Sequence, residues 1–315
     1  MPLTPTITEH IRQISVEGCF ELSAFQTGWM NWKAKIIEIL GTNYGESDIL
    51  NLGDHLAEIF FTTREGGRSQ NSLSGGGYGW EGLVCWYINL CMAGTRGVAI
   101  RGTSILPIPL RDSISVNYGN FKSNTESDIV VIIFPDQTNF INNKINISVQ
   151  NNRGQEIPLE KRGRFNYSEL VNQLSENNFD DFELGIIQCK TNWNDNAQIP
   201  MLWSMIYETD RFTNNAISIG KNGYSIKDIR NFTYSFMTVP TNDLSNYTQN
   251  STSVNRVRNL TGGNYWGFAT RNSIASSLKE IFNNNFRSTF SPNIRQSIRR
   301  IIPYLNNELN YFDLI

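Results

Sequence analysis

Two short apolar segments constrain the fold of this chain more than any other feature. Residues 127–134 read Ser-Asp-Ile-Val-Val-Ile-Ile-Phe, and residues 183–190 read Glu-Leu-Gly-Ile-Ile-Gln-Cys-Lys. Each is a brief run rich in β-branched residues, a pattern that predicts a buried strand. Asp128 stands at the start of the first run, whereas Gln188 and Lys190 stand at the end of the second. Antiparallel pairing of the two strands therefore brings these three residues to one edge of a sheet.

Side chains alternate along a strand, so Gln188 and Lys190 share one face while Cys189 points to the other. The same residues also fit a plain core strand, with a capping aspartate and a lysine whose head reaches solvent. The 60 positions from Asp128 to Gln188 are too many for a simple hairpin. They predict an inserted hairpin and helix between the two strands.

This arrangement resembles the PD-(D/E)XK nuclease superfamily, in the variant where glutamine replaces the acidic residue before the lysine. The Ser-Asp-Ile-Val-Val start of the first segment and the Lys190-Thr191 end of the second carry the likeness. It implies an α/β fold with a mixed central sheet flanked by helices, and helical N- and C-terminal elaborations. It also implies a Mg²⁺ site made by Asp128, Gln188 and the main-chain carbonyl of Cys189, with Lys190 orienting the attacking water.

Residues 80–91 predict a helix that is apolar almost all round and therefore buried. Its only charge, Glu81, has two interpretations. A carboxylate in the first turn can complement the helix dipole, which is worth about 0.3–1 kcal/mol. Alternatively, many restriction endonucleases carry a glutamate on the helix before the catalytic strands, where it faces the metal, and Glu81 occupies that place. Asp195 is either the N-cap of a following helix or a further metal ligand.

A formal net charge of −2 gives no overall attraction to nucleic acid, so any DNA binding depends on a local basic surface. Three polar segments offer such residues: a glycine-rich segment, a short basic cluster, and the Asn-, Ser- and Thr-rich loop 241–263. Each also fits a plainer description, as a linker, a solvated charge run or a surface loop. The candidates for DNA contact are Arg64, Arg68, Lys161, Arg162, Arg164, Arg256 and Arg258. Solvated and phosphate-facing roles are both open for Arg96, Arg101 and Arg111.

Periodicity predicts the remaining elements. Residues 7–62 are expected to be helical, with one amphipathic stripe ending at Gly41 and another helix over 47–61. Further strands are expected over 97–101, 114–116, 217–219 and 234–239, with a hairpin formed by 144–149 and 157–164. Further helices are expected over 167–176, from 201 onward with Met201, Leu202, Met205 and Ile206 in one stripe, and over 226–232, 273–286 and 294–305.

With 39% apolar and 18% charged residues, the composition is that of a globular protein. No repeat, heptad run or linker divides the sequence cleanly, so we expect one α/β domain spanning residues 1–315. Within it we expect a helical part at 1–62, a catalytic core at about 75–215, and a recognition and dimerisation part at about 216–315. The four cysteines lack Cys-x-x-Cys spacing and three lie in apolar context, which favours free, buried thiols in a reducing cytoplasm. The resemblance implies that this cytoplasm is bacterial or archaeal. Two histidines leave little for a zinc site. Neither a leader peptide nor a membrane span is expected.

The resemblance implies a type II restriction endonuclease that hydrolyses phosphodiester bonds in double-stranded DNA with Mg²⁺, leaving 5′-phosphate and 3′-hydroxyl ends. It also implies a homodimer, which addresses the two strands of a palindrome. A modification-dependent or repair nuclease on the same core is a close alternative. A DNA-binding module without catalytic activity is an alternative from a different class.

Overall fold

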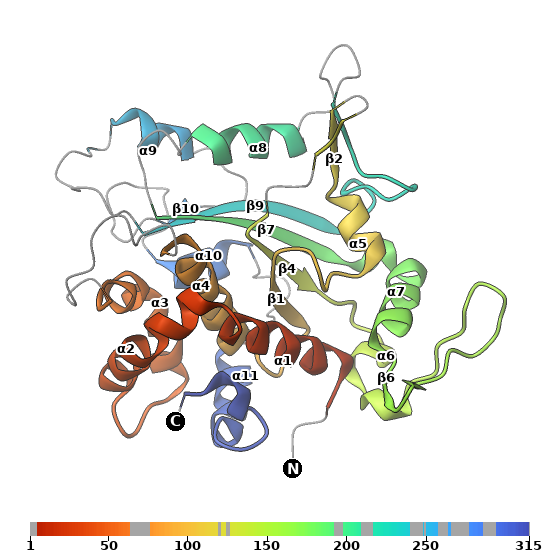
Figure 1. The fold of residues 1–315 in the computed structure, drawn as a ribbon, viewed down its shortest axis with the longest axis horizontal. Coiled ribbons are helices and arrows are strands. Elements are labelled where there is room, and N and C mark those ends of the chain that lie inside the picture. The colour runs from red at the N-terminus through yellow and green to blue at the C-terminus, as the bar shows by residue number, and fades with distance from the viewer. Residues whose placement is uncertain are drawn as a thin grey trace.

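A computed structural model describes residues 5–63, 76–118, 121–123, 127–191, 198–208, 217–239, 248, 250–257, 264–265, 277–285 and 294–314. Its centre is a five-stranded sheet in the order β1 (Gly97–Arg101), β4 (Ile129–Ile133), β7 (Glu183–Lys190), β9 (Asn231–Thr238) and β10 (Asn264–Tyr265). The first two pairings are antiparallel and the last two are parallel. The fold is thus α/β with a mixed sheet flanked by helices, as expected (Figure 1).

The apolar runs form central strands because both of their faces are covered. Along β4, Ile129, Val131 and Ile133 point into one hydrophobic cluster, whereas Val130 and Ile132 point into another. All five side chains are buried. A strand covered on both faces needs a continuous apolar sequence, not an alternating one.

Helices cover the first face of the sheet. They are α2 (Ser23–Leu40), α3 (Glu46–Phe61), α4 (Gly76–Met92), α10 (Leu278–Asn285) and α11 (Ile294–Ile301). From Trp80 to Met92, α4 is buried at every position but that of Glu81, in agreement with its apolar sequence. The stripe on α2 ends as expected, because Gly41 follows the last helical residue with a positive φ of 66°.

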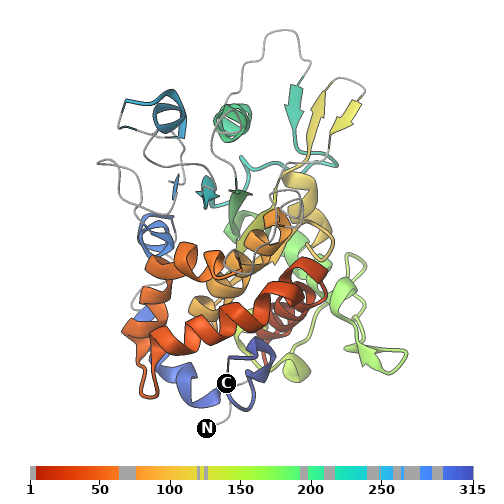
Figure 2. The ribbon, with the colours of Figure 1, turned by 60° about the vertical axis from the view of Figure 1, so that its left-hand side comes forward.

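The second face is covered by shorter helices: α5 (Ile108–Ser113), α6 (Thr138–Ile141), α7 (Tyr167–Asn177), α8 (Gln198–Glu208) and α9 (Thr252–Val257). The first helix, α1 (Ile7–Phe20), packs on β1 and sends side chains into both clusters. A small sheet joins β3 (Phe121–Ser123), β2 (Val116–Tyr118) and β8 (Ile217–Ile219) in that order. Figures 1 and 2 show this sheet, α8 and α9 on the side of the main sheet away from α2 and α3.

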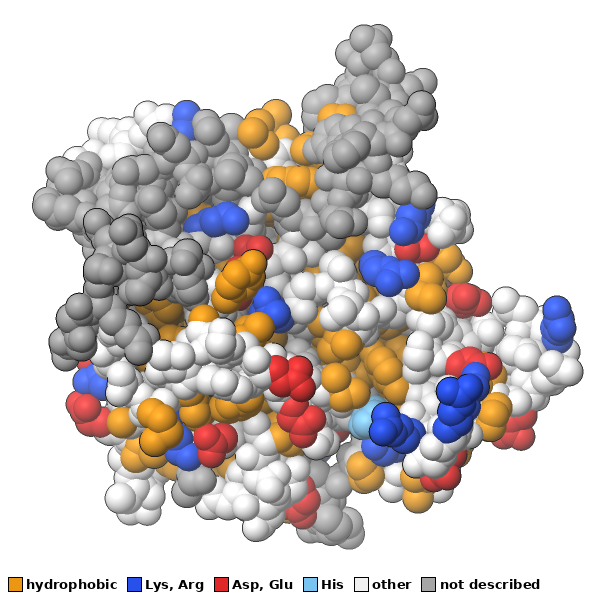
Figure 3. Space-filling model, viewed as in Figure 1, with side chains coloured by type: hydrophobic (Ala, Val, Ile, Leu, Met, Phe, Trp, Pro, Cys, Tyr) orange, Lys and Arg blue, Asp and Glu red, His pale blue; other side chains and the backbone are white. Residues whose placement is uncertain are grey.

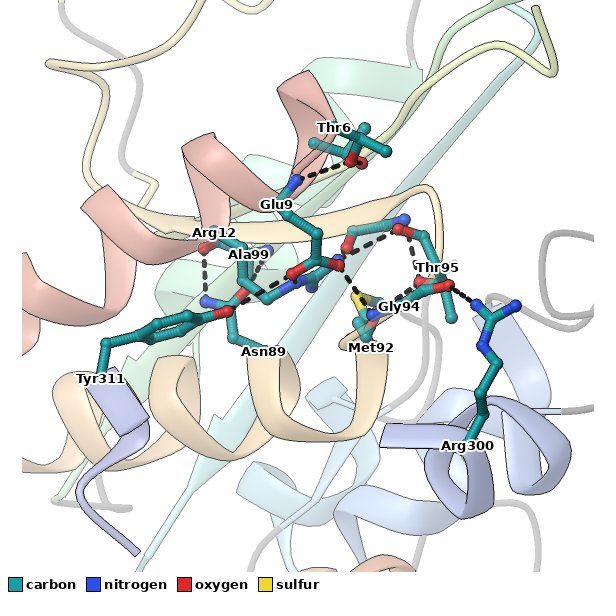
Figure 4. Close-up of polar contacts among 12 residues, drawn as sticks. Thr6, Glu9, Arg12, Asn89, Met92, Gly94, Thr95, Ala99, Arg300 and Tyr311 are labelled. Carbon is teal, nitrogen blue, oxygen red and sulfur yellow. Dashed lines mark hydrogen bonds and ion pairs between the residues drawn. The ribbon is translucent and has the colours of Figure 1, made fainter. Parts of the chain in front are cut away.

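A buried polar network ties α1 to the start of β1 (Figure 4). Arg12 is fully buried, and its guanidinium donates to the carboxylate of Glu9 at 3.1 Å. The same group donates to the carbonyls of Gly97 at 2.7 Å and Thr95 at 3.1 Å. Tyr311 donates to Glu9 at 3.4 Å, so the network also reaches the C-terminal 3₁₀-helix Asn310–Phe312. Every charge here has several partners.

Several expected elements differ from the structure. Residues 226–230 form turns and bends, and β9 begins at Asn231, so the expected helix over 226–232 is wrong. Phe232, Tyr234 and Phe236 alternate with polar residues and pack in one cluster, which is the pattern of a strand. The expected hairpin over 144–149 and 157–164 is wrong in extent. Residues 144–146 form a 3₁₀-helix, a single bridge joins Gln150 to Glu156, and the hairpin proper is β5 (Glu160–Lys161) with β6 (Arg164–Phe165).

Smaller differences concern element ends. The strand expected at 114–116 begins only at Val116, and the last helix gives way to the 3₁₀-helix Ile302–Tyr304. The α8 stripe is partly wrong, because Trp203 and Tyr207 face the core while Leu202 and Met205 are each 50% exposed. All four cysteines are free and buried, as expected. Within the described residues, no helix is long and apolar enough to cross a membrane.

Candidate functional site

The antiparallel pairing of β4 and β7 places Asp128 beside the end of β7, as the sequence predicted. Ile129 pairs with Ile187, so the same register sets Asp128 opposite Gln188. The Asp128 carboxylate accepts a hydrogen bond from the main-chain N–H of Cys189 at 2.6 Å. The ammonium group of Lys190 lies 3.9 Å from the same oxygen. A carboxylate and a lysine therefore meet at one end of the sheet.

A second carboxylate reaches this point from α4. Glu81 and Asp128 both line a cavity of about 440 Å³, whose walls are completed by Gly77, Tyr78, Arg101, Gly102 and Ser127. The Glu81 side chain is 13% exposed, and one of its oxygens lies 3.5 Å from the guanidinium of Arg101. Glu81 thus faces the same cavity as Asp128, from the helix that precedes both strands.

Burial and a neighbouring carboxylate both disfavour the charged form of Glu81. Burial, and after it the nearby charge of Asp128, raise the pKa of Glu81 from 4.5 to about 7 against the lowering influence of Arg101 and Lys190. Desolvation, and then the charges of Asp128 and Glu81, also hold the pKa of the Cys189 thiol well above its ordinary range. Two carboxylates that face one cavity favour a cation between them.

Gln188 has a different environment from the two carboxylates. It is fully buried, and its side-chain oxygen accepts a hydrogen bond from the hydroxyl of Tyr234 at 2.6 Å. Ile186, two positions earlier in β7, and Phe236, which pairs with Gln188 from β9, belong to the cluster on the face opposite α4. Glu81 and Gln188 thus approach the strand ends from opposite faces. As a metal ligand, Gln188 would share its oxygen with Tyr234.

The carbonyl of Cys189 is directed to the same side as Asp128. The N–H and C=O of one strand residue point the same way, and the Cys189 N–H points to Asp128. The carbonyl of the next residue, Lys190, points the other way and accepts from Val239 at 3.1 Å. The expected main-chain ligand therefore faces the region of the two carboxylates.

The sequence did not point to Tyr78, Ser127 or Thr238 as site residues, and for Arg101 it left solvated and phosphate-facing roles both open. Arg101 and Tyr78 line the cavity, and the hydroxyl oxygens of Ser127 and Thr238 are buried without a hydrogen-bond partner among the described residues. Thr238 pairs with Lys190 in the parallel ladder of β7 and β9. A signal existed for Arg101, since it is the polar end of an apolar strand, like Asp128 and Lys190. The pairing of β1 with β4 was needed to use it.

The expected DNA-binding residues that the structure describes do not form one group. Arg64, Arg68 and Arg258, together with Asp195, lie outside the described residues. Lys161, Arg162 and Arg164 are exposed on the β5–β6 hairpin, which lies beside α6 and α7 (Figure 1), and Lys161 pairs with Glu169 at 3.0 Å. Arg256 is half-buried in α9, which packs on α8.

The hairpin and the carboxylates are at opposite ends of the sheet. The chain leaves β4 at Phe134, which packs on Phe140 of α6, whereas Asp128 precedes β4. On the face shown in Figure 3, the described Lys and Arg side chains are interspersed with Asp and Glu. A further basic cluster on α11 bonds within the chain: Arg295, Arg299 and Arg300 donate to Ser47, Glu46 and the carbonyl of Gly94, respectively.

Among the described residues, no group of three or more His, Cys, Asp or Glu side chains is placed to hold a metal ion. Two carboxylates and a main-chain carbonyl nevertheless suit Mg²⁺, which commonly takes one or two carboxylates and completes its shell with water and substrate phosphate. No known family model matches the chain, and no curated protein sequence matches it.

Proposed function

We propose that this chain is a Mg²⁺-dependent endonuclease of the PD-(D/E)XK kind, acting as a type II restriction endonuclease on double-stranded DNA. The observation that carries the proposal is the meeting of Asp128, Glu81 and Lys190 at the ends of two antiparallel central strands. The raised pKa of Glu81 supports it, because a buried carboxylate with a second carboxylate beside it in one cavity is typical of a functional site.

In this proposal, Asp128, Glu81 and the carbonyl of Cys189 hold the ion, and the oxygen of Gln188 is a further candidate ligand. When bound, Mg²⁺ supplies Lewis-acid activation of the scissile phosphate and of a water molecule. The N–H of Cys189 fixes the Asp128 carboxylate through the 2.6 Å hydrogen bond, so this ligand is oriented before the ion arrives. Preorganisation of this kind lowers the cost of assembling the site.

Lys190 positions the water that attacks the phosphate. Its ammonium group lies 3.9 Å from Asp128 and is 26% exposed, so it can donate hydrogen bonds to a water at the open side of the carboxylate. In-line attack by that water releases a 3′-hydroxyl and leaves the phosphate on the 5′ end. A homodimer would present two such sites to the two strands of a palindrome.

The test is incubation of the purified protein with phage DNA and Mg²⁺, followed by electrophoresis. Discrete bands support restriction. Smears or nicks would point instead to a modification-dependent or repair nuclease, and intact DNA that is still bound by the protein would point to a non-catalytic module. Asp128→Ala serves as the inactive control. The molar mass in solution, measured by sedimentation with and without a cleavable duplex, tests the dimer.

A further inference from the structure

Three arginines flank the first strand and the helix after it, and the structure separates their roles. Arg96 donates to the carbonyl of Phe134 at 2.5 Å, and Arg111 lies 3.9 Å from the Asp112 carboxylate on α5. Arg101 alone of the three lines the cavity that holds Glu81 and Asp128. The three residues therefore differ in what they can bind, although they share the same chemistry.

The backbone holds Arg101 at the site. It is the last residue of β1 and pairs with Ile129, the residue after Asp128. Ala99, two positions earlier, faces the cluster that contains α4, so alternation turns Arg101 toward the same helix. The next N–H, that of Gly102, donates to the main-chain carbonyl of Asp128 at 2.8 Å. The guanidinium and the Asp128 carboxylate are thereby mounted on two directly bonded strands.

The bond between Arg101 and Glu81 is a loose one. Its 3.5 Å separation exceeds the 2.7–2.9 Å that is common for a charge-assisted hydrogen bond. The guanidinium also lies 5.8 Å from the centre of the Tyr78 ring, and its side chain is 29% exposed. Arg101 is therefore supported on a ring face and partly solvated, while it balances Glu81 without a tight bidentate contact.

We propose that Arg101 is a phosphate-binding residue of this site, which neutralises Glu81 in the metal-free protein and binds the phosphodiester once a divalent cation has taken its place. The inference rests on the proposed nuclease function. A divalent ion and the guanidinium compete for one carboxylate, and the displaced guanidinium remains beside the ion. A guanidinium matches two phosphate oxygens at once, whereas an ammonium group acts as a point charge.

The experiment compares Arg101→Ala and Arg101→Lys with wild type and with Arg111→Ala as the matched control. Two quantities are measured: Mn²⁺ binding to the DNA-free protein, from the paramagnetic resonance of the free ion, and single-turnover cleavage of phage DNA at saturating Mg²⁺. Arg101→Ala should bind Mn²⁺ about three- to tenfold more tightly, because a competing positive charge is gone. Its cleavage rate should fall by about 30-fold, because a charge-assisted bond to phosphate is lost.

The two changes have opposite directions, which a merely structural role would not produce. Arg101→Lys should bind Mn²⁺ like wild type, because it keeps the positive charge. It should cleave more slowly, because an ammonium group cannot bind two phosphate oxygens at once. This variant also keeps the test valid if the alanine variant does not fold. Weaker Mn²⁺ binding by Arg101→Ala, or wild-type cleavage by both variants, would overturn the inference while leaving the nuclease intact. A wild-type protein that binds Mn²⁺ but cuts no DNA would overturn both.

Discussion

A glutamate–arginine pair lies near each end of strand β1, and the two pairs differ in how many hydrogen bonds their charged groups make. At the start of the strand, the Glu9–Arg12 pair is 3.1 Å long, and further donors and acceptors from Thr95, Gly97 and Tyr311 surround it (Figure 4). At the end, the Glu81–Arg101 pair is 3.5 Å long and faces a cavity.

The difference separates an ion pair that is fully hydrogen-bonded from one with fewer partners, which under the proposed function belongs to the site. A buried charge that is fully hydrogen-bonded joins parts of the fold, and removing one partner leaves the other unpaired. A pair with an incomplete hydrogen-bond set has capacity left for a ligand. The Glu81 pair has a second carboxylate, Asp128, beside it, and burial followed by the Asp128 charge raises the pKa of Glu81. Residue types alone do not distinguish the two pairs.

The largest expected effect is that of Asp128→Ala on cleavage. We expect a loss of about 10⁴-fold in single-turnover rate, because the variant removes the carboxylate that both Cys189 and Lys190 orient. DNA binding without metal should persist or tighten, since a negative charge near the phosphates is gone. Asp136→Ala is the matched control, because this carboxylate is 74% exposed and pairs only loosely with Arg96. If Asp128→Ala cleaved DNA at the wild-type rate, Asp128 would be excluded from the site.

At the structural end of β1, Arg12→Ala should lower the free energy of unfolding by about 3–5 kcal/mol, because Glu9 keeps a buried charge without its partner. Urea unfolding followed by circular dichroism measures it. Arg111→Ala, whose side chain is 42% exposed, should change stability by less than about 0.5 kcal/mol. If Arg12→Ala were as stable as the control, the Glu9–Arg12 pair would not be a structural ion pair.

Glu81→Gln should stabilise the metal-free protein while lowering its activity. The pKa of Glu81 in the folded protein is about 7, above its ordinary 4.5, so folded protein holds a proton that the unfolded chain releases. Stability contributed by this group therefore falls as the pH rises from 4.5 to 7. The glutamine variant lacks this loss and should be more stable at pH 8 by up to about 3 kcal/mol.

The same variant should cleave slowly and require more Mg²⁺, because it leaves one carboxylate at the cavity. Thermal unfolding at pH 5 and pH 8, together with cleavage rate against Mg²⁺ concentration, measures both effects. A variant with wild-type metal dependence would reduce Glu81 to a charge at the start of a helix.

A smaller effect is expected at Gln188. Gln188→Glu should remain active, and added to Glu81→Gln it should recover part of the lost rate, because it restores the number of carboxylates. Tyr234→Phe sharpens this test, since it removes the hydroxyl that now bonds to the Gln188 oxygen. If Gln188 binds the ion, Tyr234→Phe should lower the Mg²⁺ requirement of the wild-type sequence. An unchanged requirement, with reduced stability, would make Gln188 a core residue.

The smallest effect concerns the basic residues. Arg256→Ala should reduce the slope of log binding constant against log salt concentration by about 0.9, the value of one phosphate contact. Lys161→Ala and Arg164→Ala should change it less, because their hairpin lies at the other end of the sheet from Asp128. Binding of a short duplex across a salt series gives the slopes. If all three variants had the slope of the wild type, these residues would be ordinary solvated charges.

The sequence predicted what depends on local pattern. The apolar runs located β4 and β7, their polar ends located Asp128 and Lys190, and the all-apolar helix located Glu81. The sequence could not predict what depends on long-range pairing. The partner of Gln188 is Tyr234, 46 positions away, and that of Arg101 is Glu81, on another element. The sequence predicts a helix over 226–232, yet residues 231 and 232 belong to β9, because the start of this strand is set by its pairing with β7.

The position of α4 also has a consequence for when the site can form during synthesis. The indole N–H of Trp86, on this helix, donates to the carbonyl of Phe312 at 2.9 Å, and that of Trp29 donates to Asp313 at 2.7 Å. A nascent chain still lacks these partners when the ribosome has translated both strands that carry Asp128 and Lys190. The layer that presents Glu81 is completed only after residue 313 has emerged from the exit tunnel. Under the proposed function, cleavage would therefore begin only after this region has been translated.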